Sequence, residues 1–298
     1  MKAVKIIVSI LLAVVLIFGA TNFLYYPKYK SSDAEYDISK KDTDTEITAV
    51  SANVRCWSPT DIFKKSWFYR ADLLFTSVTE QNPDIIGFQE VTKIHYKYLN
   101  SKLKGYENVI KYRDNSPLSE SCPIFYNTKR FECVDSGGFW LSETPETMSK
   151  DWGAACYRIC SYVKLRQISD GSQLVVFNTH LDHISDEARI NGINVVLDKI
   201  KQFGSLPSII MGDFNAEEDS QTYKAAIEIF DDAKYRTSNP DKSATYQNFG
   251  KELERENIDY FMISKTGIDI KDYHIINKTY DGVYPSDHFP IKIDFELS

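Results

Sequence analysis

The chain has 298 residues and a mass of 34.3 kDa, and its 43% hydrophobic and 26% charged residues are typical of a globular protein. It contains no repeat with a period of about 20 to 50 residues and no low-complexity tract, which excludes solenoids and disordered proteins. The net charge of −7 argues against a protein that grips long nucleic acid by its own positive field, although a bound divalent cation would reverse that field locally.

The N-terminus differs in composition from the rest of the chain. Two lysines precede an uncharged stretch over residues 6–26, which is long enough to cross one bilayer. A cleaved signal peptide is the alternative, but the bulky Phe18 makes the small residues after it a poor small-x-small cleavage site. We predict a signal anchor over residues 1–27 and therefore a single-pass protein of the cell membrane with an extracytoplasmic domain. Cleavage of the anchor would make the protein secreted.

A polar segment follows the anchor. Residues 28–45 carry many charges and few apolar side chains, which is typical of a linker. Apolar runs begin near Ile47, and helices and strands then mix to the C-terminus with no break that suggests a second core. We expect one α/β domain over residues 46–298.

Apolar runs of strand length recur along this domain. Strands are expected at residues 47–55, 84–90, 122–127, 161–167, 173–183, 205–215, 258–264 and 289–297. Amphipathic spacing predicts helices at residues 66–81, 187–203 and 220–230. The first of these helices stops before Asn82-Pro83, because the residue before a proline disfavours the helical conformation.

Polar residues lie where these apolar runs end or, in the last case, just before one begins. In chain order they are Asn53, Arg55, Gln89, Glu90, Asn178, His180, Asp182, Asp213, Asn215, Asp259, Asp287 and His288. Each one alone is explained by a turn, a helix cap or a solvated strand end. Their repeated occurrence is typical of layered α/β proteins, which build their sites at the ends of strands.

The side chains of this set are mostly hard oxygen ligands. Glu90, Asp213 and Asp287 supply carboxylates, and Asn53 and Asn215 add neutral oxygens. The five cysteines include no CxxC pair with metal-ligand spacing, and the five histidines are scattered. The set therefore suits Mg²⁺, with Mn²⁺ as an alternative, better than Zn²⁺.

Six short motifs resemble those of one superfamily. They are NVR at 53–55, QE at 89–90, NTHLDH at 178–183, GDFN at 212–215, IDYF at 258–261 and SDHFP at 286–290. Together they resemble the endonuclease/exonuclease/phosphatase superfamily, in a bacterial membrane-anchored or secreted subgroup. The resemblance implies a DNase I-like fold, a four-layer α/β sandwich of two mixed β-sheets flanked by helices, with the strand-end loops meeting at one metal site.

The resemblance also implies a role for each metal-binding residue. Glu90 would bind the metal, Asp287 would be a second ligand, and Asn53 would help to hold the metal or the phosphate. Abasic-site endonucleases of this superfamily have Asn-x-Asp where this chain has Asn53-Val54-Arg55. That difference argues against their subgroup and favours Arg55 as a bidentate contact to a substrate phosphate.

The remaining motif residues would carry the chemistry. Asp213 and Asn215 would position the attacking water and the phosphate, and Asp259 would orient His288. Whether Asp213 or His288 is the base stays open, because members of the superfamily differ.

Further residues complete the implied site. His180 matches the second active-site histidine of the superfamily, and Glu120 aligns by spacing alone with the acid that partners it. Candidate substrate-binding residues are Arg55, Tyr126, Arg158 and Asn178.

The leading hypothesis is a Mg²⁺-dependent hydrolase of phosphate esters, in particular phosphodiesters, that acts by metal-assisted in-line attack of water. The substrate would be nucleic acid, a phospholipid headgroup or a small phosphodiester. The alternatives are specifically a DNase- or RNase-type nuclease, a sphingomyelinase-like lipid phosphodiesterase, or a non-catalytic phosphate-binding module with the same fold. The membrane is the other expected partner, through the N-terminal helix, and no obligate protein partner is evident.

Overall fold

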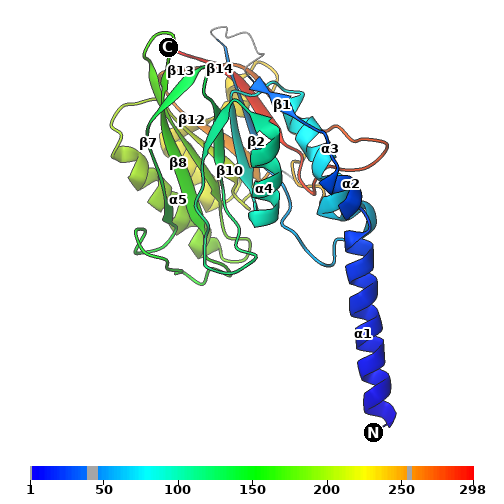
Figure 1. Cartoon of the computed structure of the whole chain (residues 1–298). Helices are drawn as coiled ribbons and strands as arrows, with labels where there is room; N and C mark the ends of the chain where they lie inside the picture. The colour runs from blue at the N-terminus through cyan, green and yellow to red at the C-terminus, as the bar shows by residue number, and fades with distance from the viewer. Residues whose placement is uncertain (1, 39–45, 254–256) are drawn as a thin grey trace.

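Two six-stranded β-sheets face each other in the computed structural model, which describes residues 2–38, 46–253 and 257–298 (Figure 1). The first sheet contains, in spatial order, β11 (Phe230–Asp232), β12 (Asp259–Ser264), β10 (Ser208–Asp213), β9 (Gln173–His180), β8 (Ile159–Gln167) and β7 (Phe131–Trp140). The second contains β13 (Ile268–Ile275), β14 (Ile291–Leu297), β2 (Ile47–Asn53), β3 (Ile85–Gln89), β6 (Ile124–Asn127) and β5 (Tyr106–Val109). Each sheet has one parallel pair, β9–β10 and β2–β3, among antiparallel neighbours, which confirms the prediction of two mixed sheets.

Helices cover the outer face of each sheet, as the predicted four-layer sandwich requires (Figure 1). The second sheet is covered by α3 (Trp67–Thr79) and α4 (Lys93–Lys102), and the first by α5 (Asp186–Lys201) and α6 (Gln221–Ile229). Short 3₁₀ turns lie in the loops at η2 (Phe63–Lys65), η3 (Ala233–Arg236) and η4 (Asn248–Gly250). The helices α3, α5 and α6 match the three predicted segments. Each begins after a serine, Ser66, Ser185 or Ser220, whose hydroxyl accepts a hydrogen bond from the first turn.

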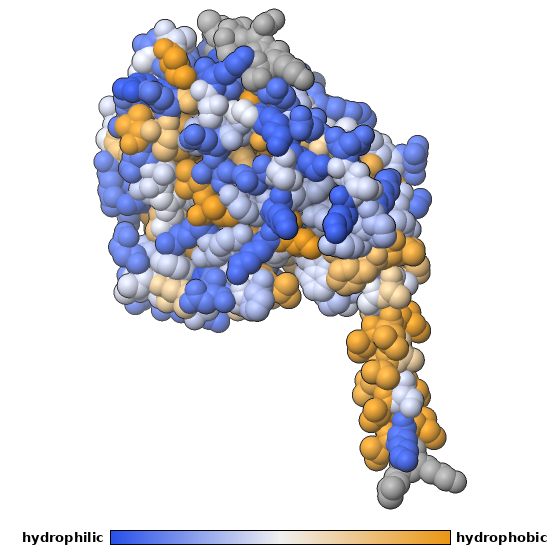
Figure 2. Space-filling view, viewed as in Figure 1, coloured by the Kyte–Doolittle hydropathy of each residue, from blue (hydrophilic) through white to orange (hydrophobic). Residues whose placement is uncertain are grey.

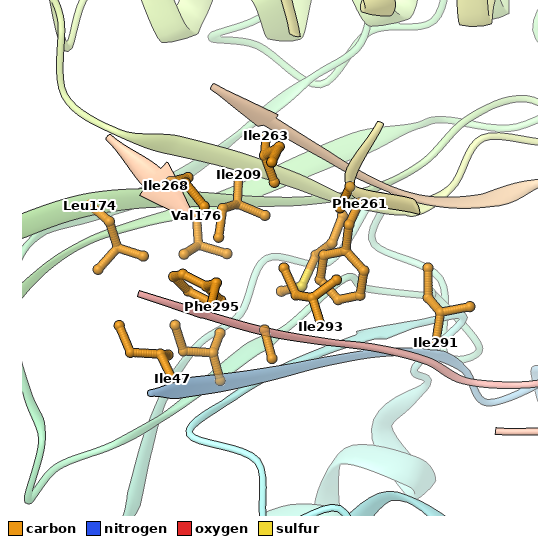
Figure 3. Close-up of a cluster of buried hydrophobic side chains, with 14 of the residues drawn as sticks. Ile47, Leu174, Val176, Ile209, Phe261, Ile263, Ile268, Ile291, Ile293 and Phe295 are labelled. Carbon is orange, nitrogen blue, oxygen red and sulfur yellow. The ribbon is translucent and has the colours of Figure 1, made fainter. Parts of the chain in front are cut away.

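Side chains alternate between the two faces of each strand, and one face points into the layer between the sheets. On β2, Ile47 and Ala49 enter this layer, whereas Val50 packs toward α3. Figure 3 shows the layer itself, where Phe261 of β12 points toward Ile293 of β14. The two sheets are therefore held together by one continuous apolar core.

The N-terminal segment is an exposed helix followed by a docked chain. The helix α1 (Lys2–Phe23) extends away from the sandwich and is long and apolar enough to cross a membrane, by length and composition (Figures 1 and 2). The next elements are α2 (Tyr26–Lys30) and β1 (Tyr36–Asp37), which pairs in parallel with β4 (Leu103–Lys104).

The expected polar linker over residues 28–45 is corrected by this arrangement. Tyr29 stacks on Tyr98 of α4, and Ile38 is fully buried, so residues 28–38 belong to the folded body. The remaining residues of the expected linker, 39–45, lie outside the described part of the chain.

Gly212 provides a test of how closely β10 and β9 approach. A Cβ at Gly212, which has φ = 140°, would lie 1.9 Å from the carbonyl oxygen of Thr179, whereas a Cβ at Gly204, with φ = 66°, would meet no atom within 4 Å. We expect Gly212→Ala to lower the free energy of unfolding by about 3 kcal/mol or more, because the strands must separate. Gly204→Ala should cost only about 1 to 2 kcal/mol of backbone strain. Chemical denaturation measures both, and equal losses would contradict the close approach.

Candidate active site

At one edge of the sandwich, the inward-facing side chains of the strands change from apolar to polar. Asn53 ends β2, His180 ends β9 and Asp213 ends β10, each on the same face as the inward apolar residues of its strand. Because β12 is antiparallel to β10, its first residue, Asp259, pairs with Asp213 at this edge. Polar groups from both sheets thus point toward one another.

Glu90 is held at this edge by two hydrogen bonds. It follows β3 with a left-handed backbone, φ = 62°, and its Oε2 accepts a hydrogen bond of 2.6 Å from the backbone N–H of Cys56. Its Oε1 accepts one of 3.0 Å from Nδ2 of Asn53. Burial would raise the pKa of Glu90, but these hydrogen bonds and the positive charge of His288 outweigh it and lower the pKa.

Asp213 receives hydrogen bonds from both sheets. Its Oδ2 accepts one of 3.0 Å from Nδ2 of Asn53, and its Oδ1 accepts one of 2.8 Å from the backbone N–H of Asn215. Burial raises the pKa of Asp213 to about 7, with Asp259 adding to the rise and His288 opposing it. Its Oδ2 lies 3.6 Å from Nε2 of His180 and 3.7 Å from Nε2 of His288.

The two histidines differ in charge because their partners differ. Burial alone would lower the pKa of His288, but Asp259, whose Oδ2 lies 2.8 Å from Nδ1, and Asp213 raise it to about 10. Burial and the positive charge of Arg158 lower the pKa of His180 well below its usual value. The Nδ2 of Asn215 lies 2.9 Å from Nε2 of His180, so this nitrogen is the acceptor on a neutral ring.

Arg55 lies at the rim between two carboxylates. Its Nε donates to Oδ2 of Asp61 at 3.0 Å, and its Nη1 lies 3.4 Å from Oδ2 of Asp287. The fully buried Arg70 of α3 holds the loop that follows β2 and the loop that precedes β14. Its guanidinium donates to the backbone carbonyls of Val54 and Arg55 in the first loop and of Pro285 in the second.

Two more arginines, Arg113 and Arg158, line the same cavity as Arg55. Arg113 donates from Nη1 to Oε2 of Glu120 at 2.7 Å, and burial raises the pKa of Glu120 to about 7. The Nε of Arg158 lies 3.3 Å from Oδ2 of Asp182, and its Nη2 lies 2.7 Å from Nδ1 of His183. The expected pairing of Glu120 with the active-site histidine is therefore corrected, because Glu120 binds Arg113.

Most of the side chains described above line one cavity of about 410 Å³. It is lined by Arg55, Cys56, Glu90, Arg113, Glu120, Cys156, Arg158, His180, His183, Asp213, Asn215, Tyr246, Ile258, Asp287 and His288. The sequence had singled out nine of these as site residues. Asn53 and Asp259 act from beneath, through Asp213 and His288. Arg113, Tyr246 and His183 also line the cavity but were not among the predicted site residues. Arg113 and Tyr246 come from loops without a strand-end pattern, whereas His183 lies inside the NTHLDH motif.

Two of the predicted substrate-binding residues do not line this cavity. Asn178 is fully buried two positions before the end of β9, where its Nδ2 donates to the carbonyls of Phe88 and Pro123 and its Oδ1 accepts from Gln89. Tyr126 faces the core between the sheets and donates to Glu107 at 2.7 Å. Both assignments are corrected: Asn178 joins the sheets, and Tyr126 belongs to the core.

The donor set of the cavity suits a divalent cation. Ligand atoms of Glu90, His180 and Asp213 lie within 4.8 Å of one another, and so do those of Asp213, Asp259 and His288. Burial and the charge of Glu90 raise the pKa of Asp287, which a cation would reverse. The Oδ1 of Asn53 accepts from the backbone N–H of Arg55 at 2.8 Å, and its Nδ2 faces the carboxylates. The expected role of Asn53 in holding the metal stays a prediction.

Comparison with known proteins identifies the family. The sequence profile of the Endonuclease/Exonuclease/phosphatase family matches residues 62–288. The chain belongs to this family. Membership makes it a hydrolase of the nuclease and phosphatase type.

Individual proteins are similar to this chain in sequence. The chain is 28% identical over 253 residues to the uncharacterized protein L388 of Acanthamoeba polyphaga mimivirus, covering 77% of this chain and 92% of that one. It is 25% identical over 281 residues to nocturnin of Drosophila melanogaster, covering 78% of this chain but only 42% of nocturnin.

Solved structures of the family are also similar. A Bacteroides thetaiotaomicron family member is 30% identical with a TM-score of 0.77, covering 86% of this chain and all of that one. A mannosyl-6-phosphatase of the same organism is 30% identical with a TM-score of 0.75, covering 84% of this chain and all of that one.

Arg70 offers a test of how the site loops are held. We expect Arg70→Met to lower the free energy of unfolding by about 3 kcal/mol or more, because several buried carbonyls lose their donor. The exposed Arg166, which pairs with Glu132, is the matched control, and Arg166→Met should cost less than about 1 kcal/mol. Urea unfolding of both variants makes the comparison, and a loss at Arg70 no greater than at Arg166 would contradict the supporting role.

Proposed function

We propose that the protein is a Mg²⁺-dependent hydrolase of phosphate esters, in particular phosphodiesters. The observation that carries the proposal is the convergence of Glu90 and Asp213 from two sheets on one cavity that also holds His180 and His288. Hard carboxylate oxygens suit Mg²⁺, which when bound supplies positive charge to phosphate oxygens. Glu90 and Asp287 would hold the ion.

Asp213 and the residues around it would have separate roles in the reaction. Asp259 fixes the His288 ring through Nδ1, which directs the Nε2–H toward Asp213 and the cavity. Asp213, held by Asn53 and by the backbone of Asn215, would accept the proton of the attacking water. His288 would then stabilise the phosphate as a charged donor.

The arginines suit the anion that this chemistry requires. Arg55 and Arg158 line the cavity, and each is oriented by a carboxylate, Asp61 or Asp182. Such guanidinium groups would orient phosphate oxygens through paired hydrogen bonds. The neutral His180 would contribute a further polar contact beside Asn215.

A phosphomonoester is the second candidate substrate. The observation that favours it is the similarity to the mannosyl-6-phosphatase, which covers 84% of the chain at 30% identity. Hydrolysis rates of bis(p-nitrophenyl) phosphate and p-nitrophenyl phosphate separate the two, and a preference for the diester is expected.

Asp213→Asn tests the proposed base. We expect the turnover of bis(p-nitrophenyl) phosphate to fall by about 10² to 10⁴-fold, because the amide cannot accept the proton of water. The half-exposed Asp231 of β11, which pairs with Arg236, is the matched control, and Asp231→Asn should leave turnover unchanged. Circular dichroism confirms that both variants are folded. Full activity of a folded Asp213→Asn would contradict the mechanism.

Metal binding is testable without turnover. At about 100 times its dissociation constant, Mg²⁺ should stabilise the folded chain by about 2.7 kcal/mol, measured as a rise in the unfolding temperature. Glu90→Gln should abolish the rise because a ligand is lost. Glu132→Gln, on the exposed surface of β7, should retain it. An equal rise in all three proteins would place the ion elsewhere.

A further inference from the structure

The end of α1 is fastened to the loop that carries one side of the cavity. Asn22 is buried, and its Nδ2 donates to the carbonyls of Ser58 at 2.9 Å and Asp61 at 3.0 Å. The hydroxyl of Ser66 donates to the carbonyl of Asn22 at 2.8 Å. Asp61 also binds Arg55 through its side chain. These contacts fix the direction of α1 relative to the cavity. A flexible tether between α1 and the folded body would leave that direction free.

Aromatic residues strengthen this junction. The rings of Phe23, Tyr26 and Tyr29 surround Phe68 of α3, with centroid distances of 5.0, 5.1 and 5.1 Å. Lys28 lies over the ring of Tyr69, 5.8 Å from its centroid. Tyrosines and lysines directly after an apolar helix are typical of the boundary between a bilayer and water. Figure 2 shows the apolar surface of α1 continuing into the base of the folded body.

The cavity lies at the edge of the sandwich toward which α1 extends. In Figure 1 the C-terminus, just after β14, lies at the opposite end of the molecule from the N-terminus of α1. His288 stands three residues before the start of β14, so it lies at the end of that strand nearer to α1. A bilayer crossed by α1 would therefore face the site edge and not the edge that carries the C-terminus.

Exposed apolar side chains lie on three loops at this edge. Phe63 follows β2 and is 51% exposed, Leu118 lies between Arg113 and Glu120 and is 54% exposed, and Ile184 follows His183 and is 65% exposed. Isolated exposed apolar residues are common on soluble proteins. Here three of them project from loops that leave the same strand ends as the cavity.

We propose that these loops rest on the bilayer from which α1 emerges, and that the substrate is the phosphate ester of a membrane lipid headgroup. The inference rests on the proposed function and names its substrate class. Three observations support it together: the fixed direction of α1, the position of the cavity and the apolar rim. Lys64 and Lys65, which directly follow Phe63, add positive charge that suits lipid phosphates.

Contact with the bilayer is tested by cross-linking, which does not require turnover. The full chain is reconstituted in phosphatidylglycerol and phosphatidylethanolamine vesicles that carry a photoactivatable phospholipid, and cross-links are mapped by mass spectrometry. We expect cross-links at Phe63, Leu118 and Ile184 and none at Val134 and Ile168. Val134 lies in the first half of β7 and is 46% exposed, and Ile168 directly follows β8 and is 55% exposed. Cross-links confined to α1 and α2 would overturn the bilayer contact.

The substrate class is tested with two variants of the full chain. The rim variant combines Phe63→Ser, Leu118→Ser and Ile184→Ser, and the control combines Val134→Ser and Ile168→Ser. We expect the rim variant to hydrolyse vesicle lipids at least about tenfold more slowly, because apolar contacts are lost. It should hydrolyse bis(p-nitrophenyl) phosphate at the unchanged rate, and the control should match the parent on both substrates.

The outcomes distinguish a failure of the lipid inference from a failure of the proposed function. Turnover of bis(p-nitrophenyl) phosphate without turnover of any vesicle lipid would overturn the lipid inference and leave the proposed function standing. Equal lipid turnover by the rim variant and the control would also overturn the inference. Absence of turnover of both substrates would overturn the proposed function itself.

Discussion

The amide of Asn53 joins the carboxylates of two different sheets. Its Nδ2 donates to Glu90, beside it in the second sheet, and to Asp213, at the end of β10 in the first. Such a contact requires the sheets to pack at a fixed separation, which the apolar layer between them provides. Deeper in the same layer, Gln89 and Asn178 form a second polar link between the sheets. The cavity therefore depends on how the two sheets pack.

Buried carboxylates of like charge are costly unless something compensates for them. His288, whose pKa is raised to about 10, supplies part of the compensation to Asp213 and Asp259. Around the rim, each of Arg55, Arg113 and Arg158 is paired with an acid. The site is thus preorganised for an anion and a divalent cation together, which is the arrangement that phosphoester hydrolysis needs.

Much of the sandwich and of the site could be predicted because both follow from the alternation of side chains along buried strands. Residues at the ends of such strands, such as Asp213, can be identified from this pattern. The pattern does not show how far a residue lies from the edge of the sandwich. Asn178, two positions before His180 on the same face, was therefore predicted as a site residue. The edge strand β7 is largely exposed and lacks the alternation, and it was not predicted. The contacts of Arg70 and the docking of residues 28–38 depend on tertiary packing, which no local pattern encodes.

The central claim is that Glu90 and Asp213, from opposite sheets, share one metal-binding cavity. Crystals of the protein soaked with Mn²⁺, which replaces Mg²⁺ and scatters anomalously, test this most directly. The account predicts an anomalous peak in the cavity, bonded to a carboxylate oxygen of Glu90. A fully occupied Mn²⁺ bound at another surface, with Glu90 turned away from the cavity, would contradict it.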